Sequence, residues 1–131
     1  MAANTAPVYT LTPFATPINV SAANTNRDGT GTIATIYTPG TNGGRLDWLN
    51  LQATVTTTAG VFRVWVRAAA AGTWFLIAEI LVEARTPSAT VQAWSYRWKP
   101  EDALILANGN LVGGSMHVAE NVVAFPQAAD F

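Results

Sequence analysis

The sequence predicts an all-β fold, a two-sheet antiparallel β-sandwich with jelly-roll-like connections and an extended N-terminal arm. Short runs rich in Val, Ile, Thr and aromatic residues recur at a spacing of about 8–12 residues, and clusters of Gly, Pro and Asn separate them. No long stretch shows helical periodicity. An immunoglobulin-like sandwich is the alternative topology, which the missing Cys-Trp-Cys signature disfavours only weakly.

Residues 1–17 are predicted to form the arm. Three prolines fix φ in this segment and remove backbone donors, which favours an extended conformation over regular strand pairing. The aromatic side chains of Tyr9 and Phe14 are candidate anchors on a neighbouring subunit. A terminus packed on its own domain explains the same residues equally well.

Residues 18–131 are expected to form one sandwich domain, close to the common domain size of about 100–150 residues. Asn42-Gly43-Gly44 and Asn108-Gly109-Asn110 are predicted turns, because Gly and Asn adopt positive φ at low cost. The run from Phe75 to Ala84 also permits a helix, but the all-β context favours a strand. The expected strands are 18–22, 31–38, 45–56, 60–68, 73–83, 90–98, 103–106 and 111–125, the last with a break near Glu120 and Asn121.

Two of the expected strands alternate clearly, as side chains that point to opposite faces of a sheet require. In the strand 45–56, apolar side chains are predicted to face the core and polar ones the solvent, namely Leu49, Leu51, Ala53 and Val55 against Asn50, Gln52, Thr54 and Thr56. In the strand 60–68, Arg63, Trp65 and Arg67 are predicted to lie on the face away from the core. This Arg-Trp-Arg ladder is a candidate contact surface.

A second aromatic feature lies in the strand 90–98. Trp94, Tyr96 and Trp98 occupy alternate positions and therefore share one face, where they form a continuous stripe. The stripe is interpreted as core, as a subunit interface or as a platform for sugar rings, and all three readings stay open.

Composition limits the classes of partner. Only 11% of the residues are charged, against about 25% in an ordinary domain, so part of the surface is expected to lie against other protein. Lys99 is the only lysine and the arginines are scattered, which argues against direct binding of nucleic acid. The sequence contains neither a membrane span nor a signal peptide. We therefore expect no membrane partner, and we expect synthesis in the cytoplasm.

The chemistry-bearing residues predict neither an enzyme nor a cofactor or metal site. His117 is the only histidine, and Ser115 beside it lacks the turn that exposes a nucleophile. The segment from Asn24 to Gly29 opens like a calcium-binding loop, but Thr35 stands where the bidentate Glu is needed, so Asx turns are the preferred interpretation. The carboxylates form no recognisable catalytic pair.

Residues 22–67 resemble a family of small proteins encoded among the head genes of tailed bacteriophages. The motifs that carry the resemblance are Asn-x-Asn-Arg-Asp-Gly-Thr-Gly at 24–31, Gly-Gly-Arg-Leu-Asp at 43–47 and Thr-Thr-Thr-Ala-Gly at 56–60. Thr86-Pro87-Ser88-Ala89-Thr90 and the closing Asn-Val-Val-Ala-Phe at 121–125 with the terminal Asp-Phe extend it along the chain. The tryptophan-rich strands depart from the pattern.

The resemblance implies a capsid decoration or cement protein, a non-enzymatic virion protein that binds the outer surface of the capsid shell. The implied partner is the major capsid protein, and a homodimer or homotrimer on the shell is expected. The implied location is the outside of the virion, after synthesis in the cytoplasm of a bacterial host. The alternative is a carbohydrate-binding β-sandwich module of a phage head fibre or tail that uses Trp94 or Trp98.

Overall fold

A computed structural model of the chain describes residues 10–69 and 71–131. These residues contain ten strands and no α-helix, and nothing in this part of the chain qualifies as a membrane-crossing helix. The strands are β1 (Thr12–Phe14), β2 (Ile18–Val20), β3 (Ala34–Tyr37), β4 (Gly44–Ala53), β5 (Gly60–Arg67), β6 (Trp74–Val82), β7 (Ser95–Trp98), β8 (Leu104–Leu106), β9 (Leu111–Met116) and β10 (Val122–Asp130).

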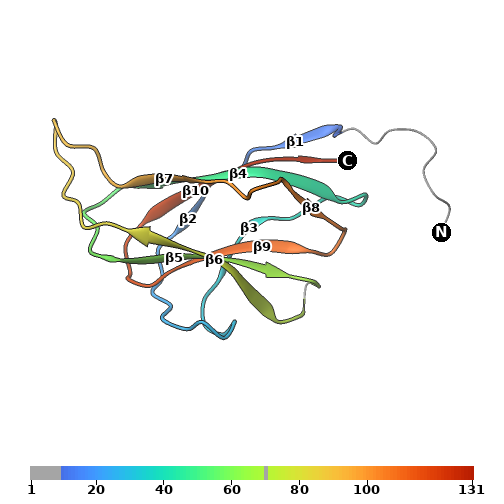
Figure 1. Cartoon of the computed structure of the whole chain (residues 1–131), viewed down its shortest axis with the longest axis horizontal. Coiled ribbons are helices and arrows are strands. Elements are labelled where there is room, and N and C mark those ends of the chain that lie inside the picture. Colours follow the sequence, from blue (N-terminus) through green and yellow to red (C-terminus); the bar gives the residue numbers. More distant parts are fainter. Residues whose placement is uncertain (1–9, 70) are drawn as a thin grey trace.

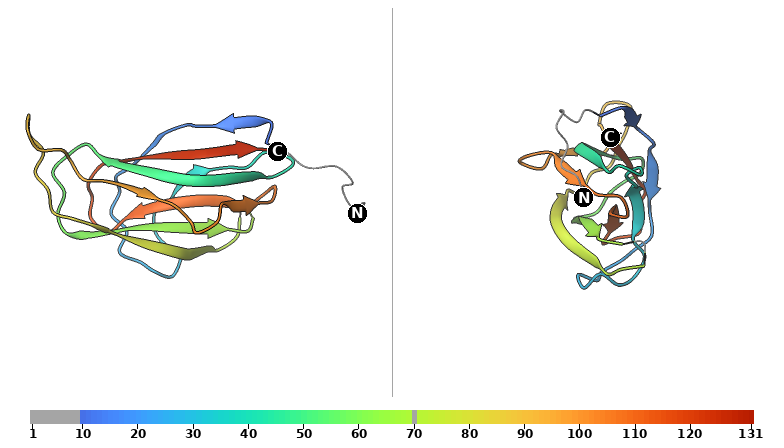
Figure 2. Two further views of the ribbon diagram at one scale, coloured as in Figure 1. Left: turned by 45° about the horizontal axis from the view of Figure 1, so that its top comes forward. Right: turned by 90° about the vertical axis from the view of Figure 1, so that its right-hand side faces the viewer.

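The strands form two antiparallel sheets that lie against each other as two layers (Figure 1). The six-stranded sheet has the order β1-β10-β4-β7, with β2 also paired to β10 and β8 also paired to β4. The four-stranded sheet has the order β3-β9-β5-β6. The strands run along the long axis of the molecule (Figure 2). The prediction of an all-β, two-sheet antiparallel sandwich is confirmed, and the jelly-roll connections stay a prediction.

The core lies between the sheets because apolar residues alternate with polar ones along the central strands. Leu49, Leu51 and Ala53 of β4 point inward and are buried, whereas Gln52 is exposed on the outer face, as the alternation predicts. Val55 is an exception, because β4 ends at Ala53 and leaves that side chain exposed. Buried residues of β5, β9 and β10 complete the core, among them Phe62, Val64, Val112, Met116, Val122 and Ala124.

The N-terminal segment differs from the predicted arm where the structure describes it. Residues 12–14 form β1, which pairs with the end of β10 in the register Thr12 to Asp130. Phe14 packs edge-on against Tyr37 of the same domain, with ring centroids 4.8 Å apart, so it is anchored on its own chain. Tyr9 and the rest of the predicted arm lie outside the described residues.

Tyr37 joins this end of the sandwich to the C-terminal strand. Its side chain is fully buried, and its hydroxyl donates a hydrogen bond of 2.7 Å to Asp130 Oδ1. Burial, followed by the contact with Asp130, raises the pKa of Tyr37, so the phenol stays protonated and keeps its role as donor. One buried polar contact therefore joins β3 of the four-stranded sheet to β10 of the six-stranded sheet.

A proline in β10 explains why the strand beside it is broken. Pro126 lies in an interior strand, although proline has no N–H for a sheet ladder. On the side of β10 opposite β4, β1 ends at Phe14 beside Ala128 and β2 begins at Ile18 beside Ala124. The gap between β1 and β2 thus lies next to Pro126, where one backbone donor is missing.

The four edges of the two sheets are unequal. One edge of the six-stranded sheet consists of the short strands β1 and β2, and the other of the short strands β7 and β8. β3 forms one edge of the four-stranded sheet with four residues. β6 forms the remaining edge with nine consecutive residues and is the longest edge strand in the described part of the chain.

Candidate functional site

The aromatic stripe of β7 lies on the inner face of the six-stranded sheet. Tyr96 pairs with Leu51 and Trp98 with Leu49, both of which face the core. The backbone of Trp94 accepts a hydrogen bond from the inward-facing Ala53. The prediction that the three aromatic residues share one face is therefore confirmed, but their exposures differ. Trp94 is only 4% exposed, Trp98 packs partly on the core, and Tyr96 is 49% exposed.

A groove of about 560 Å³ separates this stripe from the edge of the other sheet. β7 and β6 are edge strands of different sheets, so the gap between the two layers is open along this side. The β7 side of the groove is formed by Trp94, Ser95, Tyr96, Trp98 and Lys99, and the β6 side by Glu79, Ile80, Leu81, Glu83 and Arg85.

Two arginines fix the charge of Glu79, which is one of the residues lining the groove. Glu79 accepts a hydrogen bond of 2.9 Å from Arg27 Nε and another of 3.0 Å from Arg63 Nε. Arg27 first, and Arg63 in addition, hold the pKa of Glu79 below its usual value, so this carboxylate is ionised and cannot act as a general acid. The exposed ring of Tyr96 and the half-buried ring of Trp98 lie beside charges of both signs, and such rings can contact a peptide segment or a sugar ring.

The edge strand β6 carries three exposed apolar side chains, of which Leu81 lines the groove. Phe75 is 62% exposed and Leu81 is 77% exposed, and Ile77 is exposed between them. The sequence predicted the strand, but it did not predict that these three side chains are exposed. An edge strand has solvent on one side, so an apolar run on it is not covered by a neighbouring strand.

The predicted Arg-Trp-Arg ladder is not exposed. Arg63 and Trp65 are both 0% exposed, so the prediction that they form a contact surface is wrong. They do point away from the core between the sheets, but a second small core lies on this outer face, in which Trp65 packs with Trp74, Leu111, Ile33 and Leu76. Arg67 is half-buried and lies over the Trp74 ring at 4.5 Å.

The covering residues belong to the segment 21–33, which crosses the outer face of the four-stranded sheet at the bottom of Figure 1. The backbone of Asn24 donates to Met116 of β9, and a parallel bridge joins Ala23 to the same residue. Ile33 packs on the small core from this segment. Because one chain segment covers this face, its polar residues become buried and must find partners.

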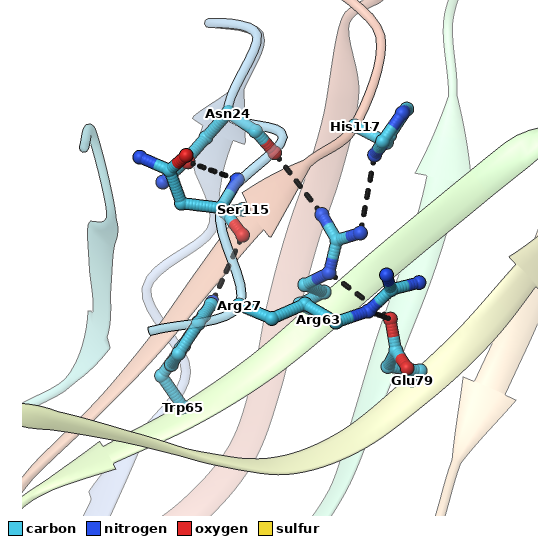
Figure 3. A network of polar contacts seen from close by, with 8 residues as sticks. Asn24, Arg27, Arg63, Trp65, Glu79, Ser115 and His117 are labelled. Atoms are coloured by element: carbon cyan, nitrogen blue, oxygen red, sulfur yellow. Dashed lines mark hydrogen bonds and ion pairs between the residues drawn. The ribbon is translucent and has the colours of Figure 1, made fainter. Parts of the chain in front are cut away.

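Arg63 is the centre of the polar contacts beneath that segment (Figure 3). Its Nη1 donates to the backbone oxygen of Asn24 at 3.0 Å, and its Nε donates to Glu79 Oε2 at 3.0 Å. Its Nη2 lies 3.1 Å from Nδ1 of His117. A guanidinium group has donors only, so this histidine nitrogen is the acceptor. Each of the three guanidinium nitrogens thus meets an acceptor from a different part of the chain.

Ser115 and His117 serve this packing and do not form a catalytic pair in the described residues. Ser115 Oγ accepts a hydrogen bond of 2.8 Å from Nε1 of the buried Trp65, and the described contact of His117 is with Arg63 (Figure 3). A serine nucleophile needs its hydroxyl beside the imidazole that activates it. Both side chains satisfy buried donors instead.

The segment that resembles a calcium loop forms turns, as predicted. Asn24 Oδ1 accepts a hydrogen bond from the backbone of Asn26, and Asp28 Oδ1 accepts one from the backbone of Thr30. These contacts are Asx turns. The hydroxyl of Thr30 and then its backbone hold the pKa of Asp28 below its usual value. Within residues 10–69 and 71–131, no three potential acidic, His or Cys ligands gather around one point.

Sequence reasoning missed the β6 side of the groove and one further contact. On the outer face of the six-stranded sheet, Arg97 lies 5.0 Å from the Trp48 ring and donates to Asn50 Oδ1. Alternation could have placed Asn50 and Arg97 on that face, because both flank inward-facing residues. No local signal shows that the edges β6 and β7, far apart in the sequence, lie on either side of one groove.

Comparison with family models, with curated proteins and with solved structures found no match in any of the three. The fold and the groove are therefore described from this chain alone. The resemblance to phage head proteins stays a prediction.

Proposed function

We propose that this chain is a non-enzymatic structural protein of a virion, a capsid decoration protein that binds the outer surface of the major capsid protein shell and stabilises the head. The observation that carries the proposal is the concentration of exposed apolar and aromatic side chains along one side of the sandwich, at β6 and the groove beside it. In a chain with 11% charged residues, such a side suits burial against protein.

The strand pairing supports the jelly-roll part of the proposal. β2 pairs with β10, β3 with β9, β4 with β7 and β5 with β6, so strands from the two ends of the chain pair in nested order. Folding one long antiparallel hairpin over on itself gives this order, with alternate pairs in opposite sheets. We infer a jelly roll.

The proposed shell contact is the aromatic wall of the groove, formed by Tyr96, Trp98 and Lys99 on its β7 side. Tyr96 supplies an exposed ring with a polar tip, Trp98 supplies apolar area beside it, and Lys99 adds a single charge at the end of the wall. Aromatic residues surrounded by a few polar groups are typical of the centres of protein interfaces. A homo-oligomer would present several such walls to one shell and gain affinity by avidity.

The test is co-sedimentation of the purified protein with expanded capsid shells that lack it, with unexpanded shells as a comparator. We expect saturable binding and a higher disruption temperature of the decorated shell. Tyr96→Asp should weaken binding by about tenfold or more, as loss of a central aromatic contact does. The matched control is Ile105→Asp, which changes an exposed side chain outside the groove. Absence of shell binding by the unchanged protein would refute the proposal.

A carbohydrate-binding module of a head fibre or tail is the second candidate. The observation that favours it is the pairing of aromatic rings at Tyr96 and Trp98 with the carboxylate of Glu83 across an open groove. Rings that stack on sugars and acceptors that bind their hydroxyls are both present there. Saturable binding to host glycans that is lost in Trp98→Ala, without binding to shells, would establish this candidate.

A further inference from the structure

We propose that the β6 edge is a self-association site, at which two copies of this chain pair β6 with β6 in antiparallel fashion about a two-fold axis. The two four-stranded sheets would then form one continuous sheet of eight strands. This inference rests on the self-association that the proposed function includes, and it names the strand, the symmetry and the register.

The first observation is that β6 is an open edge. Within the described residues, no strand pairs with the side of β6 that faces away from β5. Open edges expose a row of unpaired backbone groups and are usually kept short, broken or charged. The other three edges are short or broken, whereas β6 has nine residues and exposes Phe75, Ile77 and Leu81.

The second observation is the pairing with β5, which fixes the face of each β6 residue. Glu79 and Leu81 pair with Arg63 and Val61 and therefore share the outer face. Ala78, Ile80 and Val82 pair with Val64, Phe62 and Gly60 on the inner face. A bulge shifts the register at Ile77, so the alternation on one side of that residue is reversed on the other side.

Among two-fold axes centred on residues 78 to 81, charge and face together select one register. If the two-fold axis were centred on Glu79, the Glu79 carboxylates of the two copies would lie opposite each other. If it were centred on Leu81, Glu79 of one copy would lie opposite Glu83 of the second copy. Like charges directly opposite each other destabilise a sheet. Centring it on Ala78 would bring inner-face residues opposite outer-face ones, because of the bulge.

Centring the pair on Ile80 avoids both conflicts. Ile80 then lies opposite itself, Ala78 lies opposite Val82 of the second copy, and Glu79 lies opposite Leu81 of the second copy. All of these pairs match in face, and none opposes two charges of the same sign. The self-complementary pattern of β6 therefore fits a second copy of the same strand.

The experiment measures the dimer directly, without capsid shells. Sedimentation of the full chain between about 1 and about 100 μM should show a reversible dimer. Leu81→Glu should weaken the dimer by about tenfold, because it places a second carboxylate opposite Glu79 twice in each dimer. Leu81→Lys removes the same apolar side chain but places an ammonium group there, and should change the dissociation constant by less than about threefold. Thermal unfolding of both variants checks that they fold.

Cross-linking tests the register independently, because the chain has no cysteine. In the proposed pair, residue 81 of each copy lies diagonally across from residue 81 of the other, about 7–8 Å apart between backbones. Leu81→Cys should therefore give a covalent dimer with a short bis-maleimide, whereas Ile105→Cys, on β8 of the other sheet, should not.

Three results would overturn the inference: a monomer at all concentrations, equal loss of the dimer in Leu81→Glu and Leu81→Lys, or a dimer that Leu81→Cys fails to cross-link. Its failure is separable from failure of the decoration proposal. A monomer that binds shells would refute the β6 pair alone, and a β6-paired dimer that binds no shells would refute decoration alone.

Discussion

The outer faces of the two sheets carry similar residues, but one face is covered by another segment of the chain and the other is not. On the four-stranded sheet, Arg63 and Trp65 are fully buried beneath the segment 21–33. On the six-stranded sheet, Trp48 is half-buried and Arg97 is exposed beside its ring. Both faces derive from strands that alternate in the same way. Alternation thus determines which face a side chain occupies, and a distant segment determines whether that face is covered.

The largest difference between the two faces is expected from their arginines. Arg63→Ala should destabilise the fold by about 3 kcal/mol, because it removes a buried cation and leaves the acceptors of Asn24 and His117 without their donor. Arg97→Ala, on the uncovered face, should cost less than about 1 kcal/mol. Urea unfolding of the two variants measures both values, and equal losses would contradict the comparison.

The next effect concerns how closely the covering residues approach the sheet. A Cβ at Gly113 of β9 would lie 2.7 Å from Ile33 Cγ2 and 2.8 Å from the Trp74 ring, so Gly113→Ala should cost about 1–3 kcal/mol through overpacking. The control is Gly60→Ala on β5, where the nearest atom would be 3.5 Å away and the change should be nearly neutral. A tolerated alanine at residue 113 would mean that the covering layer is loosely packed.

A smaller effect distinguishes the indole groups of the two faces. Trp65→Phe removes the donor to the buried Ser115 and should cost about 1–2 kcal/mol. Trp48 Nε1 is buried without a hydrogen-bond partner in the described residues, so Trp48→Phe should be close to neutral or stabilising. Both substitutions replace an indole with a phenyl ring, so thermal unfolding compares the two variants directly. The reverse order would mean that the Trp65 hydrogen bond contributes no stability.

The smallest effect is a dependence on pH that only the covered face should show. The pKa of Glu79 is lowered in the folded state from its ordinary value of 4.5. A lowered carboxyl pKa stabilises the fold fully above that ordinary value, and the contribution disappears as the pH falls through the folded-state pKa. The unfolding midpoint of the wild-type chain should therefore drop more steeply below about pH 4.5 than that of Glu79→Gln. A wild-type profile in Glu79→Gln would mean that the contacts of Glu79 with Arg27 and Arg63 contribute nothing to the pH dependence of stability.

Most of the strands could be predicted from the sequence because each depends on local pattern. Seven of the expected runs, from 18–22 to 103–106, each overlap one strand, and the run 111–125 overlaps two with the predicted break between them, although β10 continues to Asp130. β1 was missed because Pro13 argues against a strand, and only the free edge of β10 makes pairing possible there. The turns at Gly43 and Gly109 were found because both require positive φ.

The candidate site could be predicted only in part. Periodicity placed Trp94, Tyr96 and Trp98 on one face, but their different exposures depend on where the opposite sheet ends. The ladder of Arg63 and Trp65 was assigned to the surface because its alternation is that of an outward face. Nothing near those residues indicates that a segment about 30 residues earlier in the chain covers them.

By itself, the sequence determined the fold class, most of the strands, and the alternation of faces in β4, β5 and β7. These depend on side-chain alternation and on turn residues, which act over a few neighbours. The tertiary structure alone decided that the ladder is buried, that β6 is an uncovered edge and that β6 and β7 border one groove. Each of these depends on which distant strands become neighbours, and burial and exposure follow from that arrangement of the whole chain.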